Sequence, residues 1–194
     1  MAAELTARGA AARLVEGVLG EHVSLADQIL RGALAPLSPP DRARAQRLAL
    51  VTLRNLSRAD GVLKPLMRKV PPSAVQSLLR VAVTEMLAEG APAHGVVGDA
   101  VQETRGLGAE GLTGLVNAVL RRAAETPAEN WARLPAPELP GWLRGRVMSA
   151  YGKKAAQAME AAHARGAAID LTPKDGDAEA LAAQAGGTAL PTGS

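Results

Sequence analysis

The chain of 194 residues contains no cysteine and no phenylalanine, and it has one tyrosine and two tryptophans. Without cysteine it can form no disulfide, no thiolate metal site and no cysteine nucleophile. With so few aromatic rings, it also lacks the platforms on which many RNA-binding proteins stack bases. Leucine, valine and alanine must therefore build the core, and this composition favours packed helices over a sheet.

Two further absences concern the location of the protein. The sequence has no run of about 18 apolar residues, so no membrane-spanning helix is expected. It begins with MAAELTARG, without the basic region and apolar stretch of a secretory signal. Together these absences predict a cytoplasmic protein.

The sequence also offers little for catalysis. Residues 106–111 match G-x-G-x-x-G by letters, but they follow a predicted helix, whereas a dinucleotide-binding loop follows a strand. We interpret them as a turn between helices. The three histidines, His22, His94 and His163, lack metal-ligand spacing. We therefore predict no catalytic residue, cofactor-binding residue or metal ligand in this chain.

Positive charge is concentrated in one part of the sequence. The whole chain carries a net charge of +3, but residues 42–80 contain nine basic residues and one acidic residue. A local excess of this size suits a polyanion, and RNA is the obvious one. The alternative is an arginine-rich surface that only reflects a compositional bias. Because aromatic residues are scarce, RNA binding would depend on cation–phosphate contacts and hence on salt.

Hydrophobic periodicity predicts an all-α bundle over residues 1–126, with short segments rich in proline and glycine between its helices. Ser24 and Ser38 are expected to cap helices, and Asp60-Gly61 to break or bend the chain. The seven expected elements are 4–19, 24–34, 38–57, a short helix or turn at 62–69, 72–89, 94–108 and 111–125.

The helix expected over 111–125 has the most regular apolar stripe, formed by Leu112, Leu115, Val116, Val119 and Leu120. Asn117 and Arg121 lie four residues apart and off this stripe, and Arg122 lies at its flank. One interpretation is a core helix whose last-turn arginines complement the helix dipole. The other is a polar edge held at a fixed angle for a partner.

The composition changes after this helix. Residues 127–138 are rich in proline and predict a linker, and residues 139–194 predict a connector. The connector is expected to contain helices over 140–152 and 153–166, then a strand over 167–173, a short helix and a strand over 188–191. We expect four residues to be buried in its first helix: Trp142, Leu143, Val147 and Tyr151. A β-α-β fragment this small is not stable alone, which predicts a partner.

Several motifs resemble those of the NusB-type RNA-binding domain over about residues 5–125. The most specific is G-L-V-N-A-V-L-R-R at 114–122; L-L-R-V-A-V-T-E-M-L at 78–87 and D-A-V-Q-E-T-R at 99–105 support it. Further along, L-P-G-W-L at 139–143 and I-D-L-T-P-K at 169–174 resemble the connector of the Sun/Fmu family. These are small-subunit ribosomal RNA methyltransferases, in which a NusB-like domain and a linker precede an S-adenosylmethionine-dependent cytosine-C5 methyltransferase domain.

This resemblance implies a chain that recognises ribosomal RNA for a methyltransferase domain that it does not contain. The cysteines of that family are absent, so the activity is not carried over, and S-adenosylmethionine is expected only for the missing domain. Asn117 is interpreted as structural. In NusB-like domains the basic first helix and neighbouring arginines contact RNA. The resemblance therefore implies RNA contacts at Arg8 and Arg13, with Arg54, Arg58, Arg121 and Arg122 as further candidates.

Two other functions stay open at this point. One is a transcription antitermination factor that binds RNA with a ribosomal protein, although the segment after residue 130 argues against it. The other is a helical module that docks onto the methyltransferase domain without touching RNA. Self-association into a homodimer is also left open.

Overall fold

The computed structural model of the chain describes residues 5–135, 137–166, 169–174 and 176–190. All regular elements in these ranges are helical, which confirms the predicted all-α class. The α-helices are α1 (Ala7–Leu19), α2 (Leu25–Leu30), α3 (Pro39–Arg54), α4 (Leu56–Leu63), α5 (Ser73–Leu87), α6 (Ala93–Gly106), α7 (Thr113–Ala124), α8 (Ala128–Arg133), α9 (Gly141–Arg165) and α10 (Ala178–Ala185). Two short 3₁₀ helices, η1 (Lys64–Leu66) and η2 (Glu110–Leu112), precede α5 and α7.

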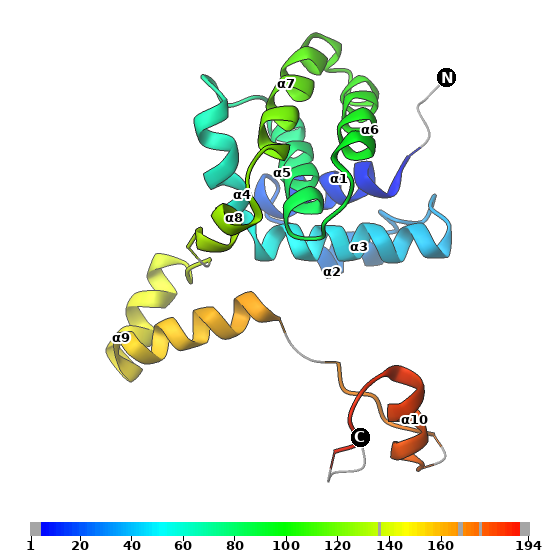
Figure 1. Cartoon of the computed structure of the whole chain (residues 1–194), viewed down its shortest axis with the longest axis vertical. Helices are drawn as coiled ribbons and strands as arrows, with labels where there is room; N and C mark the ends of the chain where they lie inside the picture. Colours follow the sequence, from blue (N-terminus) through cyan, green and yellow to red (C-terminus); the bar gives the residue numbers. More distant parts are fainter. Residues whose placement is uncertain (1–4, 136, 167–168, 175, 191–194) are drawn as a thin grey trace.

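Helix α5 is the centre of the bundle. It packs against α1, α3, α4, α6 and α7, and every residue from Val81 to Met86 is buried. Figure 1 shows α5 between α6, α7 and α4, with α1 and α3 running across the lower ends of these helices. A helix that is apolar on most of its circumference must be covered on all sides, and five neighbours provide that cover.

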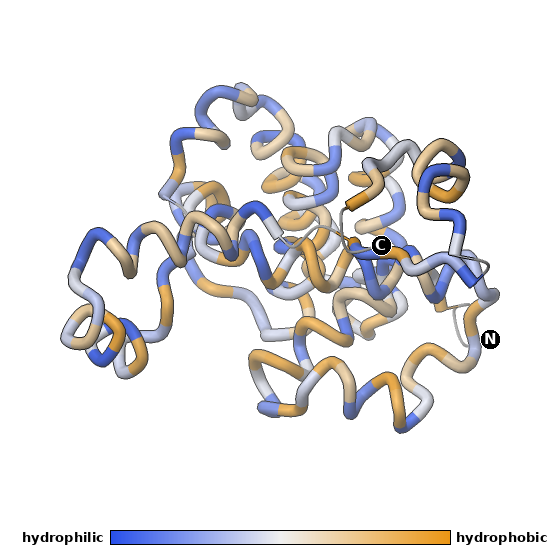
Figure 2. Tube along the Cα trace, turned by 90° about the horizontal axis from the view of Figure 1, so that it is seen from below, coloured by the Kyte–Doolittle hydropathy of each residue, from blue (hydrophilic) through white to orange (hydrophobic). Residues whose placement is uncertain are grey.

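The core lies on two sides of α5. On one side Leu79 and Val83 pack with Val116 and Leu120 of α7. On the other side Leu78 and Val81 pack with side chains of α1 and α3. Figure 2 shows apolar and polar residues alternating along the helices, as amphipathic helices require when one face is buried. The apolar stripe predicted for residues 111–125 is thus part of the core.

Serine caps set two of the helix starts, as the sequence predicts. The Ser24 side chain accepts a hydrogen bond from the backbone N–H of Asp27. Ser38 does the same for Asp41, and Pro39 follows it at the first helical position. Each cap satisfies a backbone donor that the helix itself cannot, which stabilises a helix by about 1 kcal/mol.

The predicted break at Asp60-Gly61 is wrong. Helix α4 runs through both residues, and the chain turns earlier, at Asn55 between α3 and α4. The Asp60 carboxylate accepts two hydrogen bonds, at 2.7 and 2.9 Å, from Arg80 of α5. This contact holds α4 against the central helix. A glycine in a helix costs only about 1 kcal/mol relative to alanine, which such packing offsets.

The segment 127–138 is not purely a linker, because it contains α8. Pro127 precedes the helix, where its missing N–H costs nothing. Trp131 is 6% exposed and joins the core on the α7 side. The proline content suggested an irregular strap, but the burial of one large aromatic side chain outweighs it.

Helix α9 contains the two helical segments that were predicted for 140–166, joined at Gly152, whose φ is +83°. The predicted buried set is wrong in part: Trp142 is 69% and Tyr151 67% exposed. Glu160 in the second segment holds the first segment against it: its carboxylate accepts hydrogen bonds from the backbone N–H of Leu139 and, at 2.7 Å, from Nε of Arg144. No other described residue buries the side chains of Trp142 and Tyr151.

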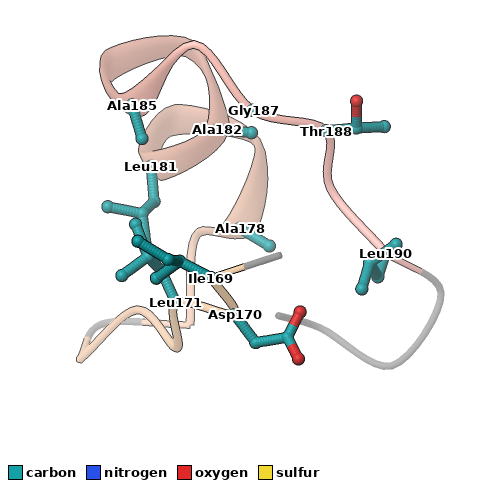
Figure 3. Close-up of a pocket in the computed structure, with 10 residues that line it drawn as sticks. All are labelled: Ile169, Asp170, Leu171, Ala178, Leu181, Ala182, Ala185, Gly187, Thr188 and Leu190. Atoms are coloured by element: carbon teal, nitrogen blue, oxygen red, sulfur yellow. The ribbon is translucent and has the colours of Figure 1, made fainter. Parts of the chain in front are cut away.

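The two strands predicted in the tail are not formed in residues 169–174 and 187–190, although the helix between them is present as α10. Residues 167–168 and 191 lie outside the described ranges. A strand needs a hydrogen-bonded neighbour, and the described residues of the tail supply none. Figure 3 shows Ile169 and Leu171 beside Leu181 of α10, with Leu190 across the hollow that they line.

None of the helices in the described ranges combines the length and the hydropathy that crossing a bilayer would require.

Replacing Trp131 with alanine tests the role of α8. We expect a loss of about 3–5 kcal/mol in the free energy of unfolding, because a buried aromatic side chain is removed from the core. Urea denaturation followed by circular dichroism measures this loss. Trp142→Ala is the matched control, and it should change stability by no more than about 0.5 kcal/mol. Equal effects of the two substitutions would contradict the burial of Trp131.

Candidate nucleic-acid interface

Arg8, the first candidate RNA contact, is a buried structural residue. Its side chain on α1 is 5% exposed. Its Nε donates to Oε2 of Glu85 at 2.6 Å and its Nη1 to Oδ2 of Asp99 at 2.8 Å. A buried guanidinium is tolerated only when it is paired in this way. Arg8 therefore has a structural role inside the bundle, and its buried, paired guanidinium offers little surface for the RNA contact that the resemblance implies.

Glu85 is the centre of this buried network. Besides Arg8, it accepts from Nη2 of Arg44 on α3 at 2.8 Å. Burial alone would raise the pKa of Glu85, but hydrogen bonds and charge from Arg8 and Arg44 outweigh burial and hold it below its usual value. Burial likewise opposes the charge on Arg8, yet Glu85 and Asp99 raise its pKa. The network joins α1, α3, α5 and α6 through charge.

Two of the other candidates lie near the connector. Arg54 is exposed at the last turn of α3. Its guanidinium lies against Gly166 at the end of α9, so closely that a Cβ added to this glycine would be 3.1 Å from Nη1. Arg58 is half-buried, and its Nε donates to the carbonyl of Leu134 at the end of α8, at 3.3 Å. Arg58 therefore holds the exit from the bundle, and its guanidinium is only partly available to a ligand.

The remaining three candidates are exposed. Arg13 on α1 and Arg122 on α7 have no hydrogen bond or ion pair within the described ranges. Arg121 donates from Nε to Oδ1 of Asn117 at 3.2 Å. Asn117 therefore orients an arginine one turn away on its own helix. Arg121 also lines a hollow between α6 and α7 that includes Glu125.

The basic segment 42–80 divides into two groups. Five of its nine cations bond within the protein: Arg42 to the carbonyls of Ala35 and Leu37, Arg44 to Glu85, Arg47 to Glu89, Arg58 to Leu134 and Arg80 to Asp60. The other four have no such partner in the described part of the chain, and all are exposed: Arg54, Lys64, Arg68 and Lys69. Lys64, Arg68 and Lys69 are not among the RNA contacts that the resemblance implies, although they contribute to the positive charge of the segment.

The glycine-rich turn at 106–111 does not fit a cofactor. It follows the end of α6 instead of a strand, and Gly108 takes a φ of +71° before η2 begins. Carbonyl groups at the end of a helix carry partial negative charge and repel phosphate and carboxylate groups. The interpretation as an interhelical turn is confirmed. Among the residues whose positions are described, no group of three histidine or acidic side chains could hold a metal ion.

The fold thus defines a small helical domain built around one buried central helix, with exposed basic side chains on its surface. Comparison with known families agrees: the model of the NusB family matches residues 5–125, which span α1 to α7. The chain belongs to the NusB family.

Curated relatives extend this similarity beyond the bundle. The chain is 30% identical over 169 residues to "Ribosomal RNA small subunit methyltransferase B" of Xanthomonas campestris, covering 80% of this chain and 37% of the relative. The protein of the same name from Thermus thermophilus is 41% identical over 127 residues, with coverage of 64% and 30%. For Escherichia coli (strain SE11) the identity is 29% over 165 residues, with coverage of 81% and 38%. The chain spans about a third of the length of these relatives and matches their N-terminal part.

Replacing Glu85 with glutamine tests the buried network. We expect a loss of about 3–5 kcal/mol in unfolding free energy near neutral pH, because Arg8 loses its closest counter-charge. The pKa of Glu85 is lower in the folded state than its ordinary value of 4.5. Its contribution is therefore complete above that value and declines as the pH falls through the folded pKa.

The difference between wild type and Glu85→Gln should accordingly shrink in acid, as measured by urea denaturation over a pH series. Glu89→Gln removes the carboxylate that pairs with Arg47, whose side chain is 63% exposed, and serves as control, with an expected cost of about 0–1 kcal/mol. A stability difference for Glu85→Gln that does not change with pH would contradict this account.

Proposed function

We propose that this chain is the RNA-recognition part of a methyltransferase that acts on small-subunit ribosomal RNA in the cytoplasm. The observation that carries the proposal is that three of the arginines given by the family resemblance, Arg13, Arg54 and Arg122, are exposed on a NusB-family bundle and have no partner within the described residues. The relatives over which the chain aligns are named as ribosomal RNA methyltransferases, and this supports the choice of RNA.

Binding would depend mainly on the phosphate backbone. A guanidinium offers several donors in a fixed plane and matches phosphate oxygens well. Arg121 and Arg122 lie at the last turn of α7, whose apolar face is fixed in the core, so their positions are set by the bundle. With three aromatic residues in the whole chain, base stacking contributes little. The domain would therefore position the RNA and leave the choice of target nucleotide to other contacts.

Methyl transfer would take place outside this chain. S-adenosylmethionine would supply the methyl group in the catalytic domain, and the one glycine-rich turn here does not fit that cofactor. The connector would join the two parts. The exposed Trp142 and Tyr151, together with the apolar residues of the tail, support a second proposal, that residues 139–194 pack against the catalytic domain.

The antitermination alternative is less well supported. The relative from Xanthomonas campestris aligns over 169 residues and 80% of this chain, which is more than the bundle alone. A module that only docks onto the catalytic domain would explain Trp142 and Tyr151, but it gives no role to the unpaired arginines of α1 and α7.

An RNA-binding measurement on two triple variants tests the proposal. Arg13, Arg121 and Arg122 are changed to alanine in one variant. The matched control changes Arg31, Arg105 and Arg133, which are also exposed but are not among the RNA contacts that the family resemblance implies. Affinity for fragments of small-subunit ribosomal RNA is measured by fluorescence anisotropy at about 50 and 200 mM salt.

We expect the wild type to bind at low salt and to lose most of its affinity at high salt, as phosphate contacts require. The first variant should bind at least tenfold more weakly, and the control should change little. The absence of binding at low salt, or an equal loss in both variants, would refute the proposal.

A further inference from the structure

A hollow with an unbalanced positive charge lies where α4, η1 and the start of α5 meet. Three exposed cations line it: Lys64 at the start of η1, and Arg68 and Lys69 in the loop before α5. The Gln76 side chain of α5 adds an amide group, and Asp60 is the one acidic residue in the lining. None of the six arginines given by the family resemblance belongs to this group.

The charge of Asp60 does not neutralise the three cations. Both of its carboxylate oxygens accept hydrogen bonds from Arg80, at 2.7 and 2.9 Å. The Arg80 side chain is 14% exposed, so this pair is a contact between α4 and α5 beneath the surface. Lys64, Arg68 and Lys69 have no ion pair or hydrogen bond with any residue whose position is described.

Two other hollows of the bundle differ in this respect. The one at the start of α1 sets Arg8 and Arg44 against Asp41 and Asp99. The hollow between α6 and α7 sets Arg121 against Glu125. Positive charge is therefore balanced locally in both, whereas at the α4–α5 hollow the basic side chains repel one another without compensation. A polyanion would remove that repulsion on binding.

The backbone that carries these cations is held in place. Leu66 and Met67, which lie between Lys64 and Arg68, pack against the core on the α7 side. The 3₁₀ helix η1 contacts both α4 and α7. Pro65 and Pro71 restrict the backbone on either side of the loop. A segment that is already ordered loses little conformational entropy when it binds a ligand.

We propose that Lys64, Arg68 and Lys69 form a second phosphate-binding site for the RNA backbone. This inference deepens the proposed function and rests on it. The cations come from two successive segments around an open hollow, so they suit neighbouring phosphates of a strand better than one small anion. Val70, which is 72% exposed beside them, offers an apolar surface to a ribose.

A charge-matched pair of variants tests the site. Lys64→Gln, Arg68→Gln and Lys69→Gln are combined in one variant of the full 194-residue chain. The control combines Lys153→Gln, Lys154→Gln and Arg165→Gln, which remove the same kinds of charge from exposed positions of α9. Binding to fragments of small-subunit ribosomal RNA is measured over a salt series, and urea denaturation checks that both variants fold.

We expect the first variant to bind at least tenfold more weakly at about 50 mM salt, and its slope of log affinity against log salt to be shallower by about 2, for three lost contacts to a single strand. The control should keep a slope close to that of the wild type. Because the three side chains are exposed and unpaired, the unfolding midpoint of the first variant should equal or exceed that of the wild type.

The outcomes separate this inference from the proposed function. Failure of the wild type to bind RNA would refute the proposed function and this site with it. Wild-type binding with an unchanged slope in the first variant, or an equal change in both variants, would refute this site alone. A first variant that keeps its RNA affinity but loses affinity for the separately expressed catalytic part would assign the hollow to a protein partner and overturn the proposal.

Discussion

The buried ion pair between Arg8 and Glu85 is the constraint on which the rest of the bundle depends. One carboxylate near the end of the central helix takes Arg8 from α1 and Arg44 from α3, while Arg8 also reaches Asp99 on α6. Arg8 and Glu85 are removed from water and must meet, which fixes α1 against α5. Arg44 and Asp99, whose side chains are 50% and 66% exposed, join α3 and α6 to this pair from the solvent side.

The same constraint divides the arginines of the chain into two classes. Some, such as Arg8 and Arg80, form ion pairs with acidic side chains of other helices and stabilise the contacts between helices. Others, such as Arg13 and Arg122, remain exposed and unpaired within the described residues. Net charge does not distinguish the two classes, but the structure does. The RNA-binding proposal rests only on the second class, and this is why the charge of the whole 42–80 segment overstates the surface that a polyanion would meet.

The sequence predicts local features of this fold well. Apolar spacing and serine caps locate most of the helices, because each of these signals is formed by residues that lie close together in the sequence. It predicts long-range partners poorly: Arg8 and Glu85 are 77 residues apart, so helical spacing could place Arg8 on a surface but could not reveal its partner. The same limit explains the burial of Trp131, the exposure of Trp142 and the continuity of α4 through Asp60. Within the described residues of the tail the predicted strands are not formed, because a ladder needs a neighbouring strand and no local pattern shows whether one is present.

The most direct test of the central claim is to locate RNA on the protein. Ultraviolet crosslinking of the chain to fragments of small-subunit ribosomal RNA, followed by mass spectrometry, identifies the peptides in contact. The account predicts crosslinks in peptides that carry exposed, unpaired cations, around Arg68 and Arg122, and none in the buried part of α5. Crosslinks confined to the connector and tail, with the bundle unlabelled, would contradict it.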